Sequence, residues 1–248
     1  MELQCFYSLS SPWMYLGGPR LEEIVKRFGV RLILKPYDFQ SIAATVGSVP
    51  LRTRPEPRKT YHADELRRWS DHLGMPINLK PKHYKPNYAP EVPVDPNWNK
   101  YAGWMVIAAQ REGRDAFRLS HSLLRALWAE ERDITRAEVR VDIANAAGYD
   151  GPLLQTLEAA AETLAEYEAF TKEAESAGVF GAPTIVFPDG ERFWGQDRFD
   201  FVERKLEKLL GSPDAAAEDV DNSGRRKSPP FIAQIQHAVT SALAPGYG

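Results

Sequence analysis

The chain has 248 residues, of which 43% are hydrophobic and 26% charged, with a formal net charge of −3 and a pI near 6.0. These values are typical of a soluble globular protein and give no reason to expect a nucleic acid or an anionic membrane as a partner. The single cysteine, Cys5, excludes an internal disulfide, a Cys-x-x-Cys redox centre and a cysteine-based zinc site.

The histidines and the apolar runs narrow the class of protein further. The five histidines are scattered, without the H-x-x-x-H spacing typical of a metal site, so we expect no bound metal. The start of the sequence has no basic stretch followed by an apolar run, and no run of about 18 apolar residues occurs. We therefore expect a cytoplasmic protein.

The beginning of the chain predicts a β-α-β unit. A strand rich in aromatic residues is expected over residues 3–9, and Ser11-Pro12 is a common helix start. Apolar residues then recur at helical spacing over residues 19–30, where Gly29 is a stop signal, and a second strand is expected over residues 31–37. Two strands joined by a helix in this way form a right-handed crossover.

The middle of the chain has the periodicity of helices. They are expected over residues 58–74, 100–112, 117–131, 135–148 and 150–177. Thr135 and Glu138 have the spacing of a capping box for the fourth of them. A proline-rich loop over residues 76–98 joins the first two, and its aromatic residues favour ordered packing.

Strand character returns near the end. Strands are expected over residues 183–187 and 191–194, joined by a hairpin turn at Asp189-Gly190. Asp197 is then expected to cap a last helix, and residues 211–228 have the composition of a disordered linker.

This order of elements predicts an α/β protein with a thioredoxin-like fold and an all-α helical insertion in its middle. We expect residues 1–45 and 180–210 to form the thioredoxin-like domain and residues 46–179 the helical insertion. Residues 211–248 are expected to form a flexible C-terminal tail.

The turn after the first strand has the outline of a Cys-x-x-Cys motif in which Ser11 and Met14 stand at the cysteine positions. Backbone N–H groups at a helix N-terminus favour an anion, including a thiolate, and a serine hydroxyl can donate a hydrogen bond to it. A purely structural cap is the commoner role of such a serine. Both roles fit the spacing.

Two further stretches could carry chemistry. Pro183 leads directly into a strand, and a cis bond there would turn the backbone of Ala182 toward a ligand; since only about 5% of X-Pro bonds in folded proteins are cis, the residues alone predict trans. Gln196 and Asp197 could bind an ammonium and a carboxylate at the start of the last helix, although capping by Asp197 is a strong alternative.

A basic cluster follows the β-α-β unit and consists of Arg52, Arg54, Arg58 and Lys59. It could hold a carboxylate, but such a cluster is more often a solvated face.

A thioredoxin-type fold brings the first β-α turn, the proline before the third strand and the start of the last helix to one place. The three stretches therefore carry more information together than separately.

Several stretches, in order, resemble those of 2-hydroxychromene-2-carboxylate isomerases, relatives of the kappa-class glutathione transferases among the DsbA-like thioredoxin folds. The resemblance covers residues 3 to 210 or so. The stretches that carry it are FYSLSSPWMYLG, LRTRPEPRKTYHADELRRW, INLKPKHY, LLRALWAEERDI and GVFGAPTIVFPDGERFWGQDRFDFV.

The resemblance implies glutathione as the cofactor. The serine aligned with Ser11 would hydrogen-bond the glutathione thiolate, and Ala182-Pro183 matches a cis-proline step whose backbone pairs with the cysteinyl part. Gln196 and Asp197 match the pair that holds the γ-glutamyl end. Arg58 lies near a basic position that meets a glutathione carboxylate. Ser48 stands where family members often carry an asparagine, so a contact from that loop is not carried over.

The resemblance also implies the reaction, a cis-trans isomerisation of 2-hydroxychromene-2-carboxylate to trans-o-hydroxybenzylidenepyruvate in naphthalene-type aromatic catabolism. A flat aromatic acid needs an apolar wall and a cation. Lys80 or Lys82 could supply the charge, and the wall candidates are Trp13, Tyr84, Tyr88, Trp98 and Trp104, for each of which ordinary packing is the alternative. Family members are usually dimers, so a homodimer is expected.

Three rival functions stay open to different degrees. A glutathione transferase acting on other electrophiles would have the same glutathione side. A non-catalytic binding protein that kept the fold is a second alternative. A thiol-disulfide oxidoreductase is disfavoured, because Met14 stands at the position of a resolving cysteine and Cys5 lies in the first strand.

Overall fold

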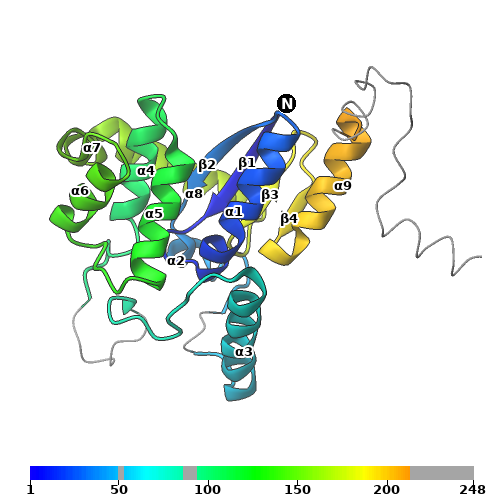
Figure 1. Cartoon of the computed structure of the whole chain (residues 1–248), viewed down its shortest axis with the longest axis horizontal. Coiled ribbons are helices and arrows are strands. Elements are labelled where there is room, and N and C mark those ends of the chain that lie inside the picture. Colours follow the sequence, from blue (N-terminus) through cyan, green and yellow to red (C-terminus); the bar gives the residue numbers. More distant parts are fainter. Residues whose placement is uncertain (50–52, 86–93, 213–248) are drawn as a thin grey trace, which may run out of the picture. The chain divides into compact units, whose positions relative to one another are not determined.

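The computed structural model describes residues 1–49, 53–85 and 94–212. The chain divides into two compact units, residues 1–205 and 206–248, and the sheet and the candidate site belong to the first. None of the described helices has the length and apolar character needed to cross a membrane. In chain order the elements are β1 (Glu2–Tyr7), α1 (Pro12–Arg27), β2 (Arg31–Pro36), α2 (Phe39–Ile42), α3 (Glu56–Leu73), α4 (Tyr101–Arg111), α5 (Ala116–Trp128), α6 (Ala137–Ala146), α7 (Gly151–Glu158), α8 (Ala161–Ser176), β3 (Thr184–Val186), β4 (Arg192–Trp194), a 3₁₀ turn (Gln196–Arg198) and α9 (Phe199–Leu210) (Figure 1).

The strands form one sheet in the order β2-β1-β3-β4. β1 and β2 are parallel, whereas β3 is antiparallel to both β1 and β4. This arrangement confirms the predicted thioredoxin-like α/β fold. Phe6 near the end of β1 is paired with Thr184 at the start of β3. The turn after β1 and the turn before β3 therefore meet at the same end of these two central strands.

Two helix signals, the Ser11-Pro12 start and the apolar spacing over residues 19–30, belong to one helix, α1. Ser11 is its N-cap and Pro12 occupies the first position, where the missing N–H costs nothing. The helix continues through Pro19, and Gly29 lies just beyond its end with φ of +61°, as the predicted stop signal requires.

The helices between β2 and β3 differ from the prediction in three places. The short helix α2 lies where no helix is expected. The helix expected over residues 150–177 is two helices, α7 and α8, separated by a break at which Ala160 has extended backbone angles. The capping box is wrong, because Arg136 is the N-cap residue of α6 and the Thr135 hydroxyl bonds Asp133 instead, at 2.6 Å. A helix-forming composition indicates helix content better than it indicates helix ends.

The two faces of the sheet are covered by different helices, α1 on one and α8 on the other (Figure 1). On the α8 side, Phe6, Tyr37 and Val186 of the sheet region pack with Ala174 and Val179 in one buried cluster. An ion pair between Lys35 of β2 and Glu173 of α8 lies on the same side. This packing fixes the sheet against the helices that follow it in the chain.

On the α1 side, the 3₁₀ turn approaches the helix closely at Gly17. A Cβ atom built on Gly17 would lie 2.4 Å from the Gln196 Cβ and 2.9 Å from a ring carbon of Phe199. Only glycine leaves room for this approach. The glycine in α1 therefore lets the start of the last helix pack on the second turn of α1.

Candidate functional site

Ser11 joins the start of α1 to the turn before β3. Its Oγ accepts a hydrogen bond from the Met14 N–H at 3.2 Å and donates one to the Ala182 carbonyl at 3.3 Å. The residue is 8% exposed, so its hydroxyl is largely shielded from water. Ser11 thus caps the helix and also contacts the second predicted site segment.

The bond between Ala182 and Pro183 is cis. The trans bond expected from the residues alone is therefore wrong, and the resemblance gave the right isomer. The Pro183 carbonyl accepts a hydrogen bond from the Gly195 N–H at 2.9 Å, and the Thr184 hydroxyl donates to the Gly181 carbonyl at 2.8 Å. The ends of β1, β3 and β4 therefore converge on this turn.

The Gln196 side chain is buried and directed toward α1. Its Oε1 accepts a long hydrogen bond of 3.4 Å from Arg20, and its Nε2 has no partner among the described residues. The backbone of this segment reaches the turn through the bond from Gly195 to Pro183, but the Gln196 side chain packs on Gly17.

Asp197 lies within the 3₁₀ turn rather than before a helix, and its exposed carboxylate pairs with Arg198 at 2.7 Å. The expected capping role of Asp197 is therefore wrong, since this turn has no side-chain cap. Its carboxylate is accessible to a ligand that binds near Ser11 and Pro183.

The electrostatics at the start of α1 favour an anion. The first turn of the helix contains no acidic residue, and the helix dipole is positive at this end. Met14, at the second cysteine-like position, is 1% exposed and belongs to the core. Cys5 is fully buried in β1, and this burial raises the pKa of its thiol far above the ordinary value. The site therefore holds no reactive sulfur of its own within the described residues.

Trp13, in the first turn of α1, contacts α3. Its ring meets the His62 ring edge to face, with 5.4 Å between the ring centres. Burial, followed by the positive charge of Arg54, lowers the pKa of His62 from its ordinary value of 6.5. His62 is therefore a neutral imidazole beside the site, and the sequence analysis did not select it, because only the docking of α1 on α3 brings it near Trp13.

Tyr84 and Trp98 belong to an aromatic cluster beside the same end of the sheet. The Tyr84 ring lies 5.8 Å from Trp98 and 4.9 Å from Trp128 between ring centres. Burial raises the pKa of Tyr84 to about 12, against the opposing charge of Arg54. The ring contacts join two of the predicted wall residues, Tyr84 and Trp98, to each other and to Trp128.

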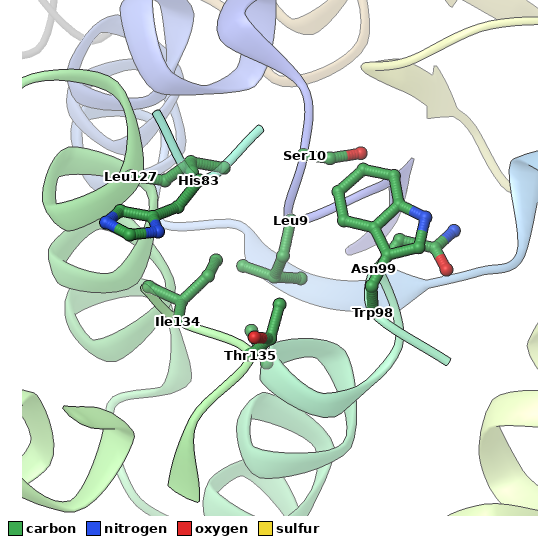
Figure 2. A pocket seen from close by; sticks show the side chains of 9 residues that line it. Leu9, Ser10, His83, Trp98, Asn99, Leu127, Ile134 and Thr135 are labelled. Atoms are coloured by element: carbon green, nitrogen blue, oxygen red, sulfur yellow. The ribbon is translucent and has the colours of Figure 1, made fainter. Parts of the chain in front are cut away.

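A pocket opens beside the turn that precedes Ser11. Figure 2 shows Trp98 and Asn99 on one side of Leu9, and His83 and Leu127 on the other. Its volume is about 10 Å³, which holds one water molecule at most. A flat aromatic acid does not fit into it as the side chains stand. The full lining is Leu9, Ser10, His83, Trp98, Asn99, Ala102, Leu127, Ile134 and Thr135.

The remaining predicted site residues lie apart or cannot be placed. Trp104 packs edge to face on Tyr101 and Tyr167 in the helical block, with ring centres 5.2 and 6.2 Å away. Arg58 is exposed near the start of α3 and close enough to Arg54 to lower the pKa of that guanidinium, although burial of Arg54 lowers it more. Tyr88, and Arg52 of the basic cluster, lie outside the described residues.

Comparison with known proteins gives one family and several similar proteins. The family model of the DSBA-like thioredoxin domain matches residues 2–207. The chain is 25% identical over 203 residues to a 2-hydroxychromene-2-carboxylate isomerase of Sphingobium xenophagum, covering 81% of this chain and 95% of that protein.

Solved structures that share the fold include the following two. A 2-hydroxychromene-2-carboxylate isomerase matches with a TM-score of 0.68 and 20% identity, over 87% of this chain and 99% of the other. The cytosolic disulfide reductase DsbM of Pseudomonas aeruginosa, solved with GSH, matches with a TM-score of 0.55 and 16% identity, over 87% of this chain and 95% of that one.

Proposed function

The chain belongs to the DSBA-like thioredoxin family, as the predicted resemblance requires, and we propose that it is a glutathione-dependent cis-trans isomerase. Its substrate in this proposal is 2-hydroxychromene-2-carboxylate and its product trans-o-hydroxybenzylidenepyruvate. The similarity to proteins named for this isomerase activity supports the reaction class. The proposal of glutathione draws on the disulfide reductase solved with GSH and on the chemistry of the site.

The observation that carries the proposal is the position of the Ser11 hydroxyl. It lies at the N-terminus of α1 and within hydrogen-bond distance of the carbonyl before Pro183, where the redox members of the fold need a cysteine. The described residues supply no thiolate there, since the only cysteine is buried in β1. A serine in this position can bind a sulfur that a ligand brings.

The residues around Ser11 fit glutathione in three respects. The start of α1 is the positive end of the helix dipole and has no acidic residue in its first turn, which suits a thiolate. The backbone of Ala182 can pair with a peptide-like ligand, in the manner of a short added strand. The exposed carboxylate of Asp197 and the exposed guanidinium of Arg58 offer one charge of each sign for the two charged ends of the tripeptide.

Bound glutathione would supply a thiolate whose reversible addition to the conjugated acid frees a carbon–carbon bond for rotation. With glutathione bound, the Ser11 hydroxyl would turn from the Ala182 carbonyl to donate to the sulfur, and the helix dipole of α1 would add to this stabilisation. Together they lower the pKa of a thiol from about 8.5 into the neutral range. Trp13, Tyr84 and Trp98 form the aromatic surroundings proposed for the flat ring.

The proposal extends to location and assembly. A protein with one buried thiol and a glutathione cofactor suits the reducing conditions of the cytoplasm, which we propose as its location. We also keep the homodimer as part of the proposal. Residues 1–45 and 180–210 are proposed as the thioredoxin-like domain and residues 46–179 as the helical insertion, which supplies Arg58 and part of the aromatic side.

The test is a product analysis with purified protein, chromene acid and glutathione. We expect the trans product to form only when glutathione is present, at a rate that depends on protein concentration. Conjugation of a chloronitroarene without any isomerisation would favour the transferase instead. Glutathione binding without turnover of either compound would instead indicate a non-catalytic binding protein of this fold.

A further inference from the structure

Two guanidinium groups stand close together before and at the start of α3. Arg54 is half-buried, and its pKa is lowered first by burial and then by the positive charge of Arg58. Arg54 donates through Nε to the Val49 carbonyl at 2.8 Å. Within residues 1–49, 53–85 and 94–212, no carboxylate forms an ion pair with Arg54 or Arg58.

The other arginines of α3 behave differently. Arg67 pairs with Asp64 at 3.0 Å, and Arg68 pairs with Glu65, in each case across one helical turn. Acids one turn away thus neutralise Arg67 and Arg68, whereas Arg54 and Arg58 have no carboxylate partner among the described residues. This asymmetry is what a site for an anion requires.

The unneutralised charges adjoin the Ser11 end of α1 through a chain of contacts. Arg54 bonds the Val49 carbonyl, and the hydroxyl of the neighbouring Ser48 donates to the carbonyl of Phe180, two residues before Ala182. The positive charge of Arg54 also acts to lower the pKa of His62 and of Tyr84. The His62 ring in turn meets Trp13 edge to face at 5.4 Å and an angle of 81°. Trp13 is two residues from Ser11 in the same helical turn. A cation, a neutral imidazole and an aromatic face therefore lie beside the proposed thiolate position.

We propose that Arg54, His62 and Trp13 form the subsite that binds an aromatic acid substrate, with Arg54 holding the carboxylate and Trp13 the flat ring. This rests on the proposed function, and it names the residues that select an acid over a neutral compound. Arg58 stays assigned to glutathione, so that each of the two anionic ligands has one guanidinium.

Each residue type suits its part in the subsite. A guanidinium binds a carboxylate through two parallel hydrogen bonds, which a lysine cannot reproduce. Binding of an anion also relieves the repulsion between Arg54 and Arg58. His62, kept neutral by burial and by Arg54, can donate one hydrogen bond to the same carboxylate without adding a third charge. Its ring packs against the Trp13 indole at an angle of 81° and so supports the indole from one side.

The kinetic test compares Arg54→Gln with Arg67→Gln, which removes the same charge from an exposed residue of α3. Arg54→Gln should raise KM for the chromene acid by about 10- to 100-fold, the loss of a charge-assisted pair. KM for glutathione, and both constants of Arg67→Gln, should stay unchanged. Arg54→Lys should lie between wild type and Arg54→Gln. An unchanged KM for the acid, or a rise for glutathione alone, would overturn the subsite.

A binding experiment separates this inference from the proposed function. Calorimetry with 1-naphthoate and the neutral 1-naphthamide, in the presence of glutathione, needs no turnover. Wild type should prefer the naphthoate, Arg54→Gln should lose that preference, and Trp13→Ala should weaken both ligands. If chromene acid is not converted but the preference depends on Arg54, the proposed function fails and the subsite stands. Equal binding of the two ligands by wild type would overturn the subsite whatever the turnover.

Discussion

The Ser11 hydroxyl donates a hydrogen bond to the Ala182 carbonyl at 3.3 Å and so connects two turns that are 171 residues apart in the chain. A hydroxyl group has one proton, while its oxygen can accept from the Met14 N–H at the same time. Stabilising a thiolate at this point therefore requires the proton to turn away from Ala182. The capping bond to Met14 can persist throughout.

The first prediction concerns Ser11→Ala. Loss of a donor to an anion in a shielded site should lower glutathione-dependent turnover by roughly 10²-fold or more. Loss of the cap should also lower the free energy of unfolding by about 1 kcal/mol. Steady-state rates and urea unfolding measure the two effects separately.

The matched control for Ser11→Ala is Asp150→Ala. Asp150 caps α7 in the same way, through a bond of 3.0 Å from the Leu153 N–H, but lies in the helical block. Its loss should cost similar stability with unchanged turnover. Equal turnover in Ser11→Ala and wild type would remove Ser11 from the proposed site.

The second prediction concerns Gly17→Ala, in a helix where alanine alone would be favourable. The added methyl group would lie 2.4 Å from the Gln196 Cβ, so the 3₁₀ turn must move away from α1. We expect a net loss of about 1–3 kcal/mol in the free energy of unfolding, with weaker glutathione binding. The combination with Gln196→Gly should recover part of the stability, although the contact with Phe199 remains. Full stability of the single variant would contradict the close approach.

The features that sequence reasoning found are those with a local physical cause. Apolar residues at helical spacing predicted most helices, and Asp189-Gly190 predicted the β3–β4 hairpin because the turn needs a residue with positive φ, which Gly190 has. Ser11-Pro12 marked the start of α1 for the same kind of reason. Local signals thus fixed the order of elements, and the order predicted the sheet.

The features that it missed depend on contacts distant in sequence. No local signal marks the break between α7 and α8, since a composition suited to helix runs through it. The proximity of Trp13 to His62 depends on how α1 docks on α3, which no spacing within either helix reveals. For the same reason the sequence does not reveal that Trp98 lies beside the site and that Trp104 packs within the helical block.

The third prediction is a loss of stability in acid. Burial is the first cause that lowers the pKa of both His62 and His121 from 6.5, so the unfolded chain binds more protons than the folded one below that value. The contribution of these two histidines to the free energy of unfolding should be constant above pH 6.5 and fall as the pH drops from 6.5 to the lowered pKa values. The slope is at most about 1.4 kcal/mol per pH unit for each histidine.

Urea unfolding at several pH values measures this loss of stability. His121→Phe keeps an aromatic ring stacked on Tyr15 and removes one titrating group. Its loss of stability in acid should therefore be smaller than that of wild type. The exposed His72 provides the control, and His72→Gln should lose as much stability as wild type. An acid profile of His121→Phe that matches wild type would exclude His121 as a cause.

The last prediction concerns Cys5, the only thiol of the chain. It is fully buried in β1 between Leu34 and Ile185, and burial raises the pKa of its thiol far above neutral pH. Because the thiolate is the reactive form, iodoacetamide should not label the folded protein and should label it in urea. Cys5→Ala should keep glutathione-dependent turnover, and wild type should not catalyse the reduction of insulin by dithiothreitol. Insulin reduction that Cys5→Ala abolishes would instead make this a redox protein, with its sulfur in the strand rather than in a ligand beside Ser11.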